Sequence, residues 1–133
     1  EHDFLRSTLV QQGIIGILLV LGADPCLSRQ IISVLCHISD CEENRPALLA
    51  DEVLNLLVSL CQDLQYKEEK MAMIFANISA VREMSLKWKI SRFALEQLVA
   101  LATSTVPGAR RYAVRALANL TMGLWRSYLF SFP

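Results

Sequence analysis

The amino-acid sequence predicts an all-α fold assembled from repeated helical units. Along nearly every long segment of the 133 residues, apolar side chains recur three and four positions apart, with helix-forming residues such as Ala, Leu, Gln, Glu and Arg between them. The strict apolar and polar alternation of a half-buried strand is nearly absent. The hydrophobic fraction of 53% excludes a disordered chain, and the length suits a single domain over residues 1–133.

Capping residues and prolines mark where the expected helices begin. Asp24 stands directly before Pro25, and Ser104 or Thr105 precedes Pro107, so in both places a capping side chain comes before a proline that suits a first helical turn. Asp51 heads an apolar run in the same way. We therefore expect helices near residues 4–12, 14–22, 25–39, 43–50, 51–63, 66–80, 84–92, 93–103 and 107–122.

Charge is balanced over the whole chain but divided along it. The 13 Lys and Arg residues match the 13 Asp and Glu residues, which excludes a strongly basic nucleic-acid binder as a description of the whole chain. Residues 1–65 hold nine acidic and three basic residues, a balance of −6, and residues 66–133 hold four acidic and ten basic residues, a balance of +6. In an elongated fold these halves would stay apart and could orient a charged partner.

The sequence predicts an intracellular protein, cytoplasmic or nuclear, with no membrane span. Its longest uncharged run, from Ser7 to Ala23, is shorter than the roughly 20 apolar residues needed to cross a bilayer. The start of the chain has no basic region typical of a signal peptide, so we expect none. The cysteines form no CxxC pair and predict free, buried thiols in a reducing compartment; they are Cys26, Cys36, Cys41 and Cys61.

Internal repeats are the most informative pattern. Three segments share a variable residue, two apolar residues, a small one, a polar His or Asn, Ile or Leu, and a hydroxyl. They are SVLCHIS at 33–39, MIFANIS at 73–79 and RALANLT at 115–121. The polar position is His37, Asn77 or Asn119, and sixteen to eighteen residues before each lies another shared apolar block.

Each repeat unit is thus a helix, a short loop and a longer helix, and such units bury their apolar faces only by stacking. The units cover about residues 9–41, 42–81 and 82–122. A tail rich in aromatic residues follows at 123–133, for which we weigh a folded-back lid, the start of a further repeat, or docking on another chain.

The run AVRALANLT at 113–121, preceded by an apolar helix and a Pro107-Gly108 break, resembles the third helix of armadillo repeats. The opening Gly13-Ile14-Ile15 resembles the Gly-Ala-Ile start of their second helix. The resemblance implies a right-handed α-solenoid of about three repeats, and HEAT repeats would give the same gross architecture. It also implies a non-catalytic interaction module or scaffold that binds an extended peptide along a concave face lined by the third helices.

An Asn on that face can pair with both the N–H and the C=O of an extended peptide. Side chains four, seven and eight residues earlier share the helix face and would set specificity. Arg110, Arg111 and Arg115 favour a partner segment that is acidic near the last repeat. The candidate partner-binding residues are Arg29, Ser33, His37, Lys70, Met73, Asn77, Arg111, Tyr112, Arg115 and Asn119.

Other interpretations stay open beside this one. Asn77 and Asn119 also suit hydrogen bonds between adjacent repeats, His37 suits a structural role, and the arginines suit a solvated face. RNA binding through the basic second half is the runner-up, because Lys87, Lys89 and Arg92 surround Trp88. A purely structural segment of a larger repeat protein is a third interpretation.

Catalysis, cofactors and metals are not expected. The sequence has no Gly-rich phosphate loop, HExxH or GxSxG, and so predicts no small-molecule substrate. A zinc site would need Cys36, His37 and Cys41 to converge, yet Cys36 and His37 adjoin on a helix and point about 100° apart.

Overall fold

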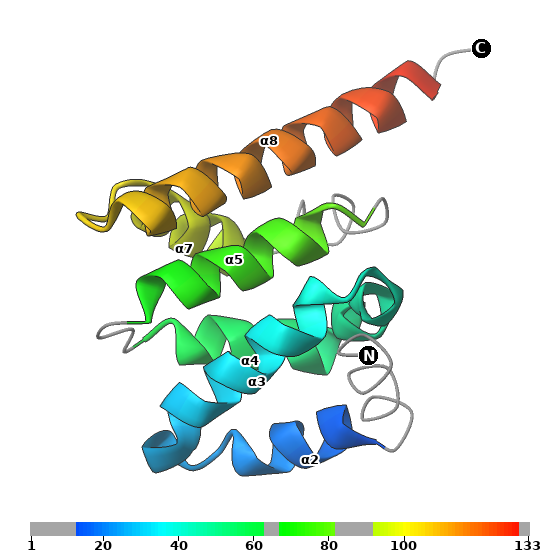
Figure 1. Ribbon diagram of the computed structural model, residues 1–133. Coiled ribbons are helices and arrows are strands. Elements are labelled where there is room, and N and C mark those ends of the chain that lie inside the picture. Colours follow the sequence, from blue (N-terminus) through cyan, green and yellow to red (C-terminus); the bar gives the residue numbers. More distant parts are fainter. Residues whose placement is uncertain (1–12, 63–66, 82–91, 131–133) are drawn as a thin grey trace.

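The computed structural model describes residues 13–62, 67–81 and 92–130, and every regular element within these ranges is a helix (Figure 1). The prediction of an all-α fold is confirmed for this part of the chain. In chain order the elements are α2 (Ile14–Leu21), η1 (Pro25–Leu27), α3 (Ser28–Asp40), η2 (Glu42–Leu49), α4 (Asp51–Leu60), α5 (Glu68–Ser79), α7 (Arg92–Ala102) and α8 (Pro107–Phe130), where η marks a 3-10 helix.

The expected caps are confirmed at two helix starts. Before η1, Asp24 Oδ1 accepts a hydrogen bond from the backbone N–H of Cys26 at 2.9 Å. Before α8, Ser104 Oγ accepts one from the backbone N–H of Val106 at 3.1 Å. Such side-chain acceptors satisfy N–H groups that have no partner within a helix. The residue before α2 is Gly13, whose φ of 86° is a left-handed conformation that glycine adopts without strain.

Near two prolines, segments expected to be α-helical form a 3-10 helix instead. The helix expected near 43–50 is η2, with Pro46 inside it, and the helix expected near 25–39 opens as η1 at Pro25 before α3 begins. Within η2, Pro46 lacks an N–H and disfavours the α conformation of Arg45, so regular α hydrogen bonding is interrupted there. The helices expected near 4–12 and 84–92 lie outside the described residues.

The last helix is longer than predicted. Its expected range was 107–122, with 123–133 as a separate tail, but α8 runs without a break from Pro107 to Phe130. The folded-back lid is therefore wrong for residues 123–130. No proline interrupts the sequence between Pro107 and Pro133, so helical hydrogen bonding can continue through Gly123.

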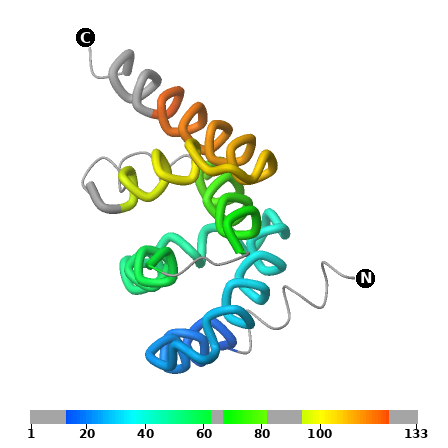
Figure 2. Tube along the Cα trace, turned by 90° about the vertical axis from the view of Figure 1, so that its left-hand side faces the viewer, coloured from blue at the N-terminus to red at the C-terminus, as the bar shows by residue number. Residues whose placement is uncertain are grey.

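The helices stack from α2 at one end to α8 at the other (Figure 1). In this stack α5 packs against α3 on one side and α8 on the other, and α7 contacts both α5 and α8. Figure 2 shows α4 and α7 together on one side of α5. The three helices α3, α5 and α8 thus lie in succession, each beside the next.

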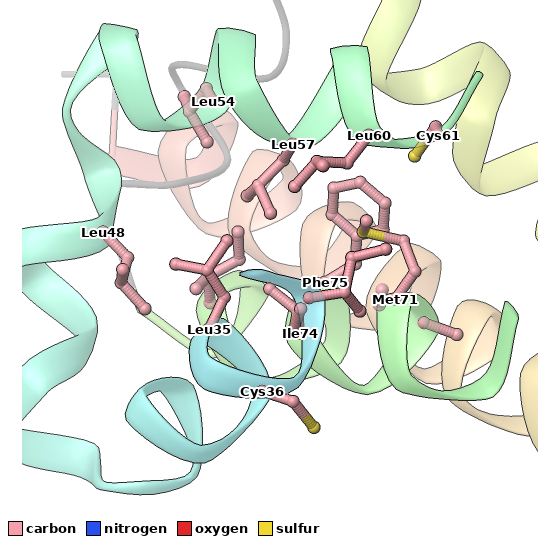
Figure 3. Close-up of a cluster of buried hydrophobic side chains, with 14 of the residues drawn as sticks. Leu35, Cys36, Leu48, Leu54, Leu57, Leu60, Cys61, Met71, Ile74 and Phe75 are labelled. Atoms are coloured by element: carbon pink, nitrogen blue, oxygen red, sulfur yellow. The ribbon is translucent and has the colours of Figure 1, made fainter. Parts of the chain in front are cut away.

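A single apolar core runs through the stack, with α5 at its centre. Met71, Ile74 and Ile78 of α5 are fully buried, and Phe75 is 1% exposed. Figure 3 shows the α4 side chains Leu54, Leu57 and Leu60 facing Leu35 of α3 and Met71, Ile74 and Phe75 of α5. The face of α8 against α5 is built from small residues that let the helices approach closely; Ala109, Ala113 and Ala116 are fully buried.

The four cysteines are free, as expected, but they are not all buried. Cys36, Cys41 and Cys61 lie in the interior, whereas Cys26 is exposed in η1. Burial raises the pKa of the Cys61 thiol to about 12.

No helix among the described residues is both long and apolar enough to cross a membrane.

The α8 leucines give a paired test of the core. The repeat pattern predicts that both Leu117 and Leu120 are buried, but only Leu120 is, at 4% exposure, and Leu117 is half-buried. Leu120→Ala should lower the free energy of unfolding by about 2–5 kcal/mol, and Leu117→Ala by less. Equilibrium urea unfolding of both variants measures the difference; equal losses would contradict the packing of α8.

Thiol reactivity tests the cysteine environments. At pH 8 a disulfide reagent such as DTNB should label Cys26 of the folded chain within seconds to minutes, because the thiol is exposed. Cys61 should stay unlabelled until the chain unfolds, because the thiolate is the reactive form and burial suppresses it. Peptide mapping after timed labelling identifies the modified residue. The Cys26→Ser variant should remove the fast phase, and fast labelling of Cys61 would contradict its burial.

Candidate interaction face

The predicted binding residues fall on the three successive helices α3, α5 and α8. Arg29, Ser33 and His37 belong to α3, Lys70, Met73 and Asn77 to α5, and Arg111, Tyr112, Arg115 and Asn119 to α8. All ten are exposed or half-buried, so none is enclosed in the core. We call these ten residues the lateral face.

The two asparagines of the lateral face join neighbouring helices. Asn77 Nδ2 donates to Ser39 Oγ at 3.1 Å, and the Ser39 hydroxyl donates to the Cys36 carbonyl of its own helix at 2.9 Å. Through these bonds α5 is held to α3. The serine is fully buried, and both of its hydrogen bonds satisfy polar groups that would otherwise destabilise a dry interface.

The same arrangement recurs between α5 and α8. Asn119 Nδ2 donates to Ser79 Oγ at 3.2 Å and to the Ala76 carbonyl at 3.5 Å. The Ser79 hydroxyl in turn donates to the Ala76 carbonyl at 2.9 Å. Thus in both pairs an Asn amide meets the serine two residues beyond the preceding polar position.

These bonds give the amide nitrogens a structural role, in which the asparagines link adjacent helices. Their side-chain oxygens accept no hydrogen bond from the described residues, and both side chains are half-buried. His37, the third member of the polar set, is exposed on α3. Contact of these three residues with a partner stays a prediction.

Positive charges gather where α3 and α5 begin. Lys70 Nζ donates to Ser33 Oγ at 3.0 Å, which joins two predicted binding residues across the α3 and α5 pair. Partial desolvation, together with the positive charges of Lys70 and Arg29, lowers the pKa of Lys67. Arg29, Lys67 and Lys70 therefore lie close enough for their charges to repel one another.

Lys67 was missed by the sequence reasoning. It precedes the first residue of α5, so it falls outside the helix positions counted back from the polar residue. Its place beside Arg29 depends on how α3 and α5 pack, which the spacing along the chain does not show.

On α8 the predicted residues separate into two groups. The Arg115 guanidinium lies over the Tyr112 ring, 5.5 Å from its centroid, which places a cation on a half-buried aromatic platform of the lateral face. Arg110 instead donates from Nη1 to the Ser104 carbonyl at 2.9 Å. Arg110 thus serves the connection before α8, where Ser104 also donates to a carboxylate oxygen of Glu68.

Of the residues considered for RNA binding or metal binding, only some lie in the described part of the chain. Lys87 and Lys89 of the RNA interpretation lie outside the described residues, and Arg92 is the first residue of α7. Within the described ranges no three His, Cys, Asp or Glu side chains come together as metal ligands would. Cys36 and Cys41 are buried, whereas His37 is exposed, so these three do not share one environment.

The Asn77 to Ser39 bond predicts measurable coupling between two helices. In a double-mutant cycle with Asn77→Ala and Ser39→Ala, unfolding free energies should show a coupling of about 0.5–1.5 kcal/mol, the worth of one hydrogen bond. The matched control pairs Asn119→Ala with Ser39→Ala, which share no bond and should be additive within about 0.5 kcal/mol. Equal coupling in both cycles would contradict the assigned partners.

The lateral face has to be interpreted from its own geometry. Comparison of the chain with protein-family models, with curated proteins and with solved structures gave no match.

Proposed function

We propose that the chain is an α-solenoid of three armadillo-like units, in which α3, α5 and α8 are the third helices. What supports this arrangement is the recurrence of one contact at the spacing of the sequence repeat. Asn77 bonds to Ser39 and Asn119 bonds to Ser79, so each unit is joined to the one before it through equivalent positions. Helices related in this way add to a stack one unit at a time.

We propose that the protein is a non-catalytic interaction module that binds an extended, acidic segment of another protein across the lateral face. The observation that carries this proposal is the cluster of Arg29, Lys67 and Lys70. The packing of α3 against α5, with Lys70 bonded to Ser33, brings these cations together, and like charges held close are unfavourable in the free protein. A carboxylate or phosphate placed among them relieves that repulsion, so the cluster favours an anionic partner.

The remaining lateral side chains suit the rest of such a segment. Met73 offers a half-buried apolar contact between the cationic cluster and the Tyr112 and Arg115 pair on α8. An extended segment rises about 3.3 Å per residue, and neighbouring helices pack about 8–10 Å apart, so each helix would meet two or three residues. Three helices would hold roughly six to nine residues.

The asparagines take a narrower part in this proposal than the sequence suggested. Their amide nitrogens hold the helices in register, so only their side-chain oxygens are offered to backbone N–H groups of the segment. Removing an asparagine would therefore alter the stack as well as the partner contact. Charged lateral residues are better probes of binding, because they make fewer contacts inside the protein.

A library of displayed disordered segments tests the proposal. Hits should be enriched in Asp, Glu or phosphoresidues, and Lys70→Ala and Arg115→Ala should each weaken them about two- to fivefold, as expected for loss of one exposed charge contact. Fluorescence anisotropy with synthetic peptides measures the affinities. Arg110→Ala is the matched control, since Arg110 is an exposed arginine of the same helix that bonds to Ser104.

Three outcomes would reject the proposal. An effect of Arg110→Ala as large as that of Arg115→Ala would show that general charge, not the lateral face, attracts the peptide. Absence of peptide hits would favour a structural segment. Binding of single-stranded RNA that falls steeply with salt and is lost on Lys87→Ala and Lys89→Ala would establish the runner-up.

A further inference from the structure

The outer side of α8 exposes positions whose equivalents are buried in the other two third helices. Val114 lies five residues before Asn119 and is 55% exposed. The residues five positions before His37 and Asn77 are Ile32, which is 1% exposed, and Ala72, which is fully buried. In Figure 1 α8 is the last of the described helices in the stack. Val114 is thus the apolar residue that a following helix would cover.

Three more positions of α8 behave in the same way. Leu117 is half-buried and Ala118 and Thr121 are exposed, whereas all their equivalents in α3 and α5 are buried. The four α8 residues follow the helical spacing i, i+3, i+4 and i+7, so they lie on one side of the helix. We call Val114, Leu117, Ala118 and Thr121 the trailing face.

The trailing face also holds the last hydroxyl in the series of hydrogen bonds that join successive helices. In α3 and α5 the hydroxyls of Ser39 and Ser79 donate to their own helix and accept the amide of the next helix. Thr121 occupies the equivalent position and donates to the Leu117 carbonyl at 2.8 Å, but it is exposed. Its oxygen is therefore presented outward, where the asparagine of a further helix would donate.

The opposite end of the stack exposes the other half of the same interface. Ile17 and Leu21 of α2 are 53% and 41% exposed, whereas the equivalent Leu56 and Leu60 of α4 are 9% and 6% exposed. On α3, Val34 is only half-buried although Ile74 and Ala116 at that position are fully buried, and His37 is exposed where the asparagines are half-buried. We call Ile17, Leu21, Val34 and His37 the leading face.

We propose that a second copy of this chain docks head to tail, with its leading face on the trailing face of the first. Given the proposed repeat arrangement, the two faces are the separated halves of an interface that the chain already forms twice within itself. His37 of the incoming copy stands where Asn77 and Asn119 stand, and its ring N–H donates to the Thr121 hydroxyl.

Charge complementarity favours this occupant over an unrelated helix. On the side of the leading face, the described stretch 13–40 carries two anions, Asp24 and Asp40, and one cation, Arg29, whereas the described side chains of α8 carry three cations, Arg110, Arg111 and Arg115, and no anion. Opposite charges attract the two ends and orient the copies head to tail. Because the contact joins unlike surfaces, each added copy leaves one leading and one trailing face free, so growth does not stop at a dimer.

Sedimentation velocity over roughly 5–500 µM protein tests the proposal. The weight-average mass of the unaltered chain should rise with concentration. Val114→Glu blocks the trailing face and Ile17→Glu the leading face, and since both residues are more than half exposed the variants should fold, as circular dichroism will check. Each variant alone should stay monomeric, because self-association needs both faces.

The decisive sample is an equimolar mixture of these two variants. Ile17→Glu keeps an intact trailing face and Val114→Glu an intact leading face, so the mixture should form a one-to-one dimer and nothing larger. Thr121→Val keeps the side-chain shape but removes the acceptor, and should weaken association of the otherwise unaltered chain about five- to tenfold. Val106→Glu, at an exposed valine before α8, is the matched control and should associate normally.

Three results would overturn the proposal. A chain that stays monomeric up to the highest concentration excludes a second copy and leaves a helix of another protein as the occupant. A monomeric mixture beside an associating unaltered chain excludes the pairing of these two faces. Equal loss of association in Val106→Glu shows that any added negative charge suffices.

Discussion

Burial of α5 between α3 and α8 is the constraint on which the rest of the structure depends. Four side chains of this helix, Met71, Ala72, Ile74 and Ile78, are completely removed from solvent, and α5 also contacts η2 and α7. Because apolar stabilisation scales with the area removed from water, this buried side of α5 contributes strongly to the stability of the stack. The positions of the lateral, leading and trailing faces follow from which side of each helix this packing leaves uncovered.

Polar groups inside this apolar stack define how the helices align. The hydroxyls of Ser39 and Ser79 are saturated by their own helices on one side and by an asparagine on the other, so neither helix can slide without leaving a buried polar group unpaired. An unpaired buried group costs about 1–3 kcal/mol, whereas the net gain of each bond is smaller. The hydrogen bonds therefore contribute more to alignment than to stability.

The helices and the repeated positions could be predicted from the sequence, because both depend on residue spacing along one chain. The 3-10 form of η2 was missed because capping patterns do not distinguish it from an α-helix around Pro46. Lys67 was missed because its neighbour Arg29 lies on another helix. The predicted set of lateral residues did identify the side chains that share these three helices, but spacing could not decide between a bond to a neighbouring serine and a bond to a partner for Asn77.

The two kinds of surface differ in how freely their residues can change. Buried positions that face a neighbouring helix hold apolar or small side chains, as in Ile32 and Ala72, because each must fit a dry interface. Equivalent positions of the lateral face hold unrelated side chains, as in Ser33, Met73 and Arg115, although Asn77 and Asn119 of this face do bond to a neighbouring helix. Substitutions at these positions of the lateral face can therefore change which segment is bound without disturbing the packing between helices. The two ends keep the residue types of an internal interface while exposed, and this likeness is the basis of the proposed docking of a second copy.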